Sequence, residues 1–220
     1  MGSSQQSVTP GRTTLLDATN VLLRNIGEMP VDTLDDEQIQ DARIAEQTLL
    51  EFHKEGQVRG WSWNREEKYP FQLDAQTGEI AVPESTMTWL VDPYREDGRY
   101  VLRGTRVYDK KNRTFQIDPN DAPIEADVIW LLSWNDCPEA YNRWTTIRAA
   151  RVLSTRMLGS DSVTNYTAVD EQAAMTELMR VEMEQSQPNS LTGGPFSGPM
   201  PTYSAEQGLR RSMFGGSYVG

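Results

Sequence analysis

Residues able to do chemistry are scarce in this sequence. His53 is the only histidine and Cys137 the only cysteine among 220 residues. A Ser-His-Asp triad or a Cys-His nucleophile pair needs an imidazole base, so either would have to use His53. His53 follows Phe52 late in an amphipathic pattern, which indicates a surface or boundary histidine, although a Cys137–His53 pair stays open. One Cys and one His are too few ligands for a zinc cluster within one chain.

The acidic residues suggest no site either. Asp32, Asp35 and Asp36 resemble a calcium loop but lack its glycine and distal glutamate, so charge near a helix N-terminus is the simpler explanation. A glycan hydrolase needs two facing carboxylates, and the adjacent Glu66 and Glu67 would point to opposite faces of a strand. We therefore expect no enzymatic activity and no cofactor.

Positive charge gathers on one expected helix, at Arg143, Arg148, Arg151 and Arg156. These arginines could pair with acids of the same chain, or they could contact an acidic neighbouring subunit. Both interpretations stay open.

A second group lies near the C-terminus, where Arg210 and Arg211 stand close to Phe214 and Tyr218. Arg and aromatic residues dominate interface hot spots, so this group is typical of a docking segment. A disordered tail is equally compatible with its composition.

The formal net charge of -11 argues against sequence-independent binding to nucleic acid, which needs Lys and Arg to displace counterions. An acidic wall would still let DNA slide past without sticking. The single cysteine allows no internal disulfide, so folding in a reducing cytoplasm is expected. No apolar run approaches the roughly 20 residues that span a bilayer.

Helical periodicity predicts four helices, at residues 14–26, 36–55, 136–158 and 167–187. Three starts have capping-box spacing, namely Thr14 with Asp17, Asp136 with Glu139, and Thr167 with Asp170. The expected stops are Gly27, Gly56 and Gly159. The second helix should bury Ile39, Ala42, Ala45, Leu49 and Phe52, and the third Ala140, Trp144, Ile147 and Met157.

Short runs alternating at period two predict a β region over residues 59–133. Asp109–Arg113 is the expected tip of a hairpin joining Thr105–Tyr108 to Thr114–Ile117, and the apolar run Val128–Leu132 predicts a central strand covered on both faces. The fold class is α+β: a bundle of about four helices with an inserted antiparallel β-sheet region. Residues 1–11 should form a flexible leader and residues 188–220 an extended C-terminal arm.

Three stretches at characteristic spacing resemble a known family. They are the turn Ile26–Val31 (Ile-Gly-Glu-Met-Pro-Val), the Gly60–Asn64 stretch (Gly-Trp-Ser-Trp-Asn) and Asp136–Ala140, which opens on a Pro-Glu pair. Over roughly Leu15 to Met157 the chain is similar to tail tubular protein A, the adaptor of T7-like, short-tailed bacteriophages.

The resemblance implies a non-enzymatic virion protein of the tail or neck, assembled in the host bacterial cytoplasm. Such subunits form a homo-oligomeric ring, a dodecamer, that joins the portal protein to the nozzle (tail tubular protein B) and the tail fibres. Genomic DNA passes through the lumen without specific binding, and no membrane is involved. Residues 12–187 would be the adaptor domain, with Lys110–Arg113 reaching outward or downward and the eight Arg and aromatic residues named above near interfaces.

Two alternatives remain at this point. One is a tail-associated cell-wall hydrolase, which requires a pocket with two facing carboxylates. The other is a head-completion or connector protein of another phage class, which would differ in ring symmetry and neighbours.

Overall fold

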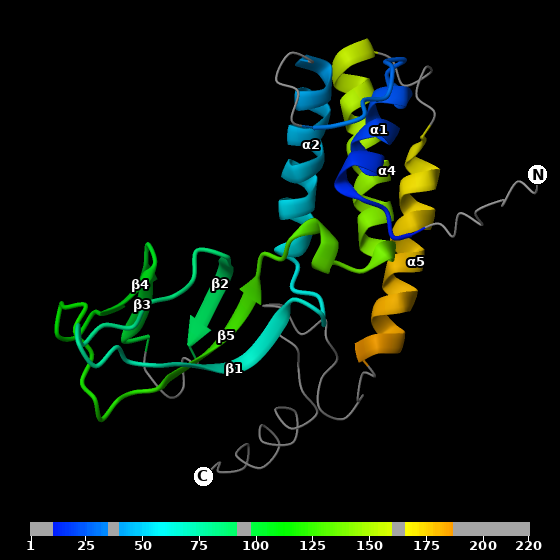
Figure 1. Cartoon of the computed structure of the whole chain (residues 1–220). Coiled ribbons are helices and arrows are strands. Elements are labelled where there is room, and N and C mark those ends of the chain that lie inside the picture. The colour runs from blue at the N-terminus through cyan, green and yellow to red at the C-terminus, as the bar shows by residue number, and fades with distance from the viewer. Residues whose placement is uncertain (1–10, 35–39, 92–97, 160–165, 187–220) are drawn as a thin grey trace, which may run out of the picture. The chain divides into compact units, whose positions relative to one another are not determined.

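The computed structural model describes residues 11–34, 40–91, 98–159 and 166–186 (Figure 1). The expected leader, apart from Gly11, and the expected C-terminal arm lie outside the described residues. The chain divides into two compact units, which are treated separately below. The helical unit comprises Met1–Gly56 and Leu132–Met179, and the sheet unit comprises Gln57–Leu131 and Arg180–Gly220. Helices and antiparallel strands are segregated along the chain, so the predicted α+β class is confirmed.

The core of the helical unit forms between α1 (Leu15–Asn25), α2 (Gln40–Gln57) and α4 (Glu139–Leu158). Leu22, Leu49 and Leu153 are almost fully buried there. Burying a leucine side chain stabilises the fold by about 1.5–3 kcal/mol, so this apolar seam holds the three helices together. The buried positions predicted for α2 are confirmed at Ala42, Ala45, Leu49 and Phe52, and the fifth, Ile39, lies outside the described residues.

Both ends of α1 follow from the local sequence. Thr14 and Asp17 form the predicted reciprocal capping box, with each side chain accepting from the other residue's backbone N–H. At the other end Gly27 is left-handed, with φ of 86°. The N–H groups of Gly27 and Glu28 donate to the carbonyls of Arg24 and Leu23, at 3.2 and 2.9 Å. This Schellman pattern satisfies carbonyls that the helix end would leave unpaired.

Helix α2 does not stop at Gly56 as predicted, but continues to Gln57. The reason for a glycine at position 56 is packing against α4. A Cβ atom there would lie 2.6 Å from Tyr141 Oη and 2.7 Å from Trp144 Cζ3. The left-handed residue that follows the helix is Gly60, with φ of 72°, and its N–H donates to Gln57 O.

The start of α4 also differs from the prediction. Its N-cap is Pro138, which offers no side-chain cap, and Asp136 belongs to a short 3-10 helix, η1 (Trp134–Asp136). Asp136 accepts a hydrogen bond from Ser133 Oγ at 2.7 Å. The expected capping box does not form because both residues bond elsewhere: Asp136 N donates to Ser133 O, and the Glu139 carboxylate accepts from Thr13.

The predicted interior of α4 is mostly confirmed. Trp144 and Ile147 are buried and Ala140 is half-buried, but Met157 is 46% exposed because it lies in the last turn, beyond the packed part of the helix. Gly159 adopts the predicted left-handed C-cap. Helix α5 (Ala168–Ser186) begins at the predicted capping box of Thr167 and Asp170.

The sheet unit contains a three-stranded antiparallel sheet in the order β1-β5-β2. The strands are β1 (Arg65–Phe71), β2 (Thr86–Val91) and β5 (Ile124–Trp130). The central place of β5 agrees with the prediction, and within the predicted run Val128 is buried on one face while Ile129 on the other face is half-buried. Cover of the second face is therefore partial, and Glu125 farther along that face is exposed. The apolar run at 128–132 is partly the end of the strand and partly the segment that follows it.

The hairpin of this unit pairs β3 (Tyr100–Arg103) with β4 (Arg106–Asp109), and not β4 with the segment after Arg113 as predicted. Gly104, with φ of 62°, supplies the turn. Asp109–Arg113 is a turn as well, closed by hydrogen bonds between Asp109 and Thr114 in both directions. Beyond it, however, only isolated bridges form, because Gln116 pairs with Glu79 rather than with β4.

Candidate functional site

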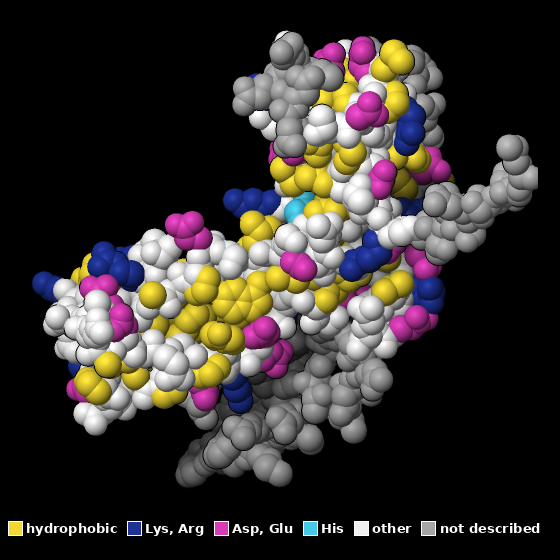
Figure 2. Space-filling view, viewed as in Figure 1, with side chains coloured by type: hydrophobic (Ala, Val, Ile, Leu, Met, Phe, Trp, Pro, Cys, Tyr) yellow, Lys and Arg dark blue, Asp and Glu magenta, His cyan; other side chains and the backbone are white. Residues whose placement is uncertain are grey.

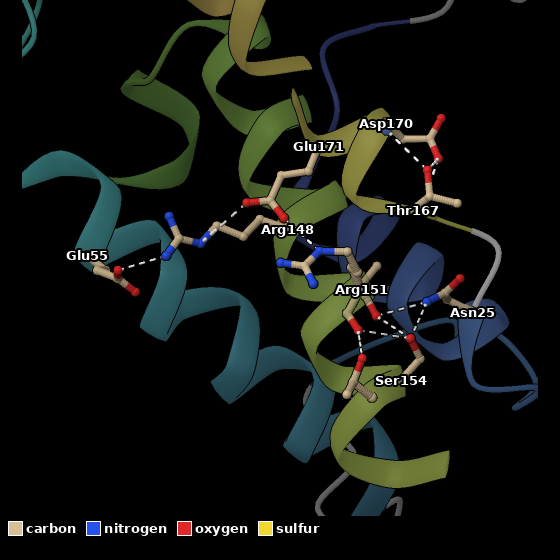
Figure 3. A network of polar contacts seen from close by, with 10 residues as sticks. Asn25, Glu55, Arg148, Arg151, Ser154, Thr167, Asp170 and Glu171 are labelled. Atoms are coloured by element: carbon tan, nitrogen blue, oxygen red, sulfur yellow. Dashed lines mark hydrogen bonds and ion pairs between the residues drawn. The ribbon is translucent and has the colours of Figure 1, made fainter. Parts of the chain in front are cut away.

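The arginines of α4 are the candidate interface residues that the structure describes, and Figure 3 shows two of them, Arg148 and Arg151. Arg151 Nε donates to Glu171 Oε2 on α5 at 2.7 Å. Arg148 Nη2 donates to Glu55 Oε1 on α2 at 2.8 Å, and its Nε lies 3.9 Å from Glu171 Oε1. Glu171 thus shares its carboxylate between two arginines, and the three residues bridge the first turn of α5 to the middle of α4.

Arg156 reaches α2 one turn earlier, where Nη1 lies 3.3 Å from Glu51 Oε2. Both side chains are more than half exposed, so this pair contributes little to stability. Arg148 and Arg156 also lie over the ring of Phe52, at 5.0 and 5.8 Å from its centroid. Their apolar stems and guanidinium planes therefore cover an aromatic residue at the edge of the core.

Arg143 differs from the other three. Its side chain is exposed, and it forms no ion pair with any residue of the described ranges. Of the two interpretations that the sequence left open, intramolecular pairing therefore applies to Arg148, Arg151 and Arg156. The C-terminal candidates, Arg210, Arg211, Phe214 and Tyr218, lie outside the described residues.

His53 is buried, contrary to the prediction of a surface or boundary position. Its Nε2 lies 3.1 Å from Leu132 O, and because a carbonyl can only accept, Nε2 is the donor. Its ring packs against the rings of Trp134 and Tyr141. Burial lowers the pKa of His53, so the neutral imidazole is favoured. Amphipathic spacing missed this burial because the covering residues come from distant sequence.

Cys137 is fully buried, and its Sγ donates to Ser133 O at 3.4 Å. Burial raises the pKa of the thiol to about 12. Thiolate is the nucleophilic form, so Cys137 is a packing residue at neutral pH rather than an activated nucleophile.

The motif at Ile26–Val31 builds a turn and fastens it to α1. The Schellman pattern at Gly27 reverses the chain, and the Asn20 side chain then bonds both the backbone carbonyl and the backbone N–H of Val31. Asn20 Nδ2 donates to Val31 O at 2.9 Å, and Val31 N donates to Asn20 Oδ1 at 2.8 Å. Between these fixed points Met29 is 83% exposed.

The motif at Gly60–Asn64 closes the sheet unit around the side chain of Asn64, which is 1% exposed. Asn64 Oδ1 accepts from Trp61 N at 2.8 Å. Asn64 Nδ2 donates to Gln57 O at 3.0 Å and to Trp130 O at 2.9 Å. One carboxamide therefore joins the residue that enters this unit, the Trp61 turn and the end of β5.

The motif at Asp136–Ala140 receives the N-terminal segment of the chain. Glu139 accepts from Thr13 N at 3.0 Å and also from the Thr13 hydroxyl. Trp134 Nε1 donates to Thr13 O at 2.8 Å, and the Arg12 guanidinium donates to Cys137 O. All three motifs thus make hydrogen bonds that hold backbone segments together within a unit.

Among the described residues, no cluster of three or more His, Cys, Asp or Glu side chains is arranged to hold a metal ion. Asp32 is exposed, and Asp35 and Asp36 fall outside these residues. Glu66 and Glu67 are both exposed on β1. No helix in the described ranges combines the length and apolar character needed to span a bilayer.

A family model described as tail tubular protein matches residues 16–188 of the chain. No curated protein matches the chain at a significant level. The family match includes α1, α2, the whole sheet region, α4 and α5, together with the three motifs that motivated the resemblance. It covers well over half of the 220 residues. The chain therefore belongs to the tail tubular protein family and is a structural component of a bacteriophage tail.

Proposed function

We propose that this chain is the adaptor subunit at the neck of a short-tailed bacteriophage. In this role its copies form a ring, a dodecamer, that joins the portal protein to the tail nozzle and the tail fibres. Genomic DNA passes through the lumen during ejection. The match of residues 16–188 to the tail tubular protein family is the observation that carries the proposal.

The chemistry of the described residues supports an assembly role. The thiol of Cys137 is buried and protonated, and His53 is engaged with a backbone carbonyl inside the core. The residues of the three motifs form turns and make hydrogen bonds that hold each unit together. Function then resides in surfaces that bind neighbours, with no bond made or broken.

Within the helical unit, Arg143 is our first candidate for such a contact. It is exposed and forms no ion pair with the described residues, whereas Arg148, Arg151 and Arg156 each have an acidic partner. An exposed arginine offers five N–H donors in a planar fork, which suits a carboxylate of a neighbouring subunit.

The decisive experiment is an image of the particle neck, combined with a binding measurement. Cryo-electron microscopy should place a ring of this chain on the tail axis between the portal and the nozzle. Analytical ultracentrifugation of the full chain, alone and with portal rings, should show association. Density away from the tail axis, or a chain that stays monomeric and ignores the portal, contradicts the proposal. A ring of different symmetry in a different place identifies a connector of another phage class.

The contribution of Arg143 is tested by Arg143→Glu, with Arg43→Glu as a control for the same charge change at another exposed position. Both variants should unfold like the wild type, since neither residue forms an ion pair in the described part of the chain. Weaker association of Arg143→Glu alone is the expected result. Equal association of the two variants removes Arg143 from the interface.

A further inference from the structure

The sheet unit contains a concentration of positive charge that the tail role leaves unassigned. Six of the 21 Lys and Arg residues lie between Arg99 and Arg113, and Asp109 is the single acid among them. The whole chain has a net charge of -11, so everything outside this segment is more acidic still. Lys and Arg side chains gather at the end of the sheet unit where β3 and β4 lie (Figure 2).

The hairpin β3–β4 separates these residues into two faces. Tyr100 pairs with Asp109 and Leu102 with Val107, and three of these four side chains are buried. On the opposite face Arg103 pairs with Arg106, and both are exposed. Two like charges directly opposite each other are unfavourable, so this arrangement needs compensation.

Aromatic rings provide part of that compensation. The guanidinium of Arg103 lies 3.6 Å from the ring centroid of Tyr108, and that of Arg106 lies 4.2 Å from the centroid of Phe115. The two rings meet edge to face at 5.0 Å. A guanidinium that already lies over a ring loses less rotamer entropy on binding, and Arg103 keeps its N–H donors for a carboxylate.

Ion pairing within the chain uses only some of these charges. Arg99 binds Asp109 at 2.6 Å and Asp121 at 2.9 Å, and Arg106 binds Glu79 at 3.1 Å. The remaining four are exposed and form no ion pair within the described ranges. We call them the basic patch: Arg103, Lys110, Lys111 and Arg113.

The turn that carries most of the patch has a fixed shape. Asp109, which is buried, accepts from the N–H groups of Lys111 and Asn112 at 2.8 and 3.1 Å. The Arg99 guanidinium beside Asp109 holds the pKa of this carboxyl below its ordinary value, so Asp109 remains an acceptor at neutral pH. The lysines therefore project from an ordered backbone.

We propose that the basic patch docks on an acidic surface of a second copy of this chain. The inference rests on the proposed ring, in which a head-to-tail contact joins two different surfaces of identical subunits. Charge complementarity selects the partner: each copy carries a local positive patch on an otherwise acidic molecule. Such contacts accelerate association and fix register more than they add affinity.

DNA is the less favoured occupant. A single strand would stack its bases on open aromatic rings, but Tyr108 and Phe115 are half-buried and covered by guanidinium groups, so this argument applies to single strands. The net charge of -11 also repels phosphates at distances where the patch alone cannot dominate.

Isotope-mixed cross-linking tests the contact directly. Unlabelled and 15N-labelled full-length chains are co-assembled, alone or on portal rings, and treated with a carbodiimide that joins touching amines and carboxylates. Mixed-isotope peptides linking Lys110 or Lys111 to an Asp or Glu of another copy are expected. Links from these lysines that are confined to single copies overturn the inference.

Charge reversal gives an independent test. The variant Arg103→Glu/Lys110→Glu/Lys111→Glu is compared with Arg24→Glu/Arg43→Glu/Lys54→Glu, which changes the charge equally at exposed positions of the helical unit. Thermal unfolding confirms that both variants fold. The patch variant should need about tenfold more protein or more for half-assembly, and added salt should weaken wild-type assembly.

The outcomes are distinguishable. If the patch variant assembles at the same protein concentration as the wild type, the inference is overturned but the proposed ring is not contradicted. If that variant also loses affinity for a short DNA duplex that the wild type binds, the patch belongs to nucleic acid. A wild-type chain that assembles neither alone nor on portal rings contradicts the proposed function itself, and the inference with it.

Discussion

Gly56 and Tyr141 bring α2 and α4 into contact with no space for a side chain at position 56. Tyr141 is fully buried and its hydroxyl donates to His53 O, so the ring cannot move aside. Gly56→Ala should therefore lower the free energy of unfolding by about 1–3 kcal/mol, although alanine gains about 1 kcal/mol in helix propensity.

Urea denaturation followed by tryptophan fluorescence measures this effect. Gly11→Ala is the control, because a Cβ atom there meets nothing within 4 Å. Unchanged stability of Gly56→Ala would contradict the close packing.

Asn64→Ala should be among the most damaging single changes in the sheet unit. It leaves Trp61 N and Trp130 O without their Asn64 partner, while Gln57 O loses one of its two donors and keeps Gly60 N. A buried unpaired polar group costs about 1–3 kcal/mol, so a loss of several kcal/mol is expected. Hydrogen exchange should show the loss in residues 57–131. Asn120→Ala, at an exposed position bonded only locally to Asp118, is the control and should change stability by less than about 1 kcal/mol.

Burial of His53 predicts a pH dependence. Its folded pKa lies below the unfolded value of 6.5, so the unfolded chain binds more protons as the pH falls below that value. The contribution to stability is present above pH 6.5 and is lost as the pH falls through the folded pKa. His53→Gln, which keeps a donor for Leu132 O, should remove this slope. The pKa values of Asp17, Asp109 and Asp170 are also lowered, from an ordinary value of 3.8. These carboxyls therefore change stability only at pH values near and below 3.8, outside the range in which His53 titrates. If the free energy of unfolding of His53→Gln depends on pH as in the wild type, the dependence arises from other groups.

Cys137 should resist thiol reagents in the folded chain. Its sulfur is fully buried and its pKa is raised to about 12, so little thiolate is present at neutral pH. A disulfide reagent should react with the single thiol only after unfolding in guanidinium. Rapid stoichiometric reaction of the native chain would show that the region around Cys137 opens readily.

Local signals in the sequence predicted much of the framework. The capping pairs Thr14–Asp17 and Thr167–Asp170 and the left-handed Gly27 and Gly159 depend on neighbours only a few residues away, so spacing alone identified them. The packed positions of α2 followed from a period of three to four residues.

Features set by distant residues were not predictable in this way. The role of Gly56 depends on Tyr141, and the burial of His53 depends on Trp134. The predicted pairing of β4 with the segment after Arg113 was wrong because Asp109–Arg113 and Gly104 are both plausible turns. Only the tertiary pairing selects between them. Likewise, counting arginines on α4 could not reveal that Glu51, Glu55 and Glu171 would neutralise three of them.

The two backbone carbonyls bound by Asn64 Nδ2 belong to the first residue of the inserted stretch and to the last residue of β5. The stretch 57–130 is thus a loop whose two ends are bonded to one side chain near its start. Turns far from this closure, such as those at Gly104 and Asp109–Arg113, make no part of it. Under the proposed assembly role, the contacts that this stretch makes with neighbours and the bonds that hold its ends together therefore depend on different residues.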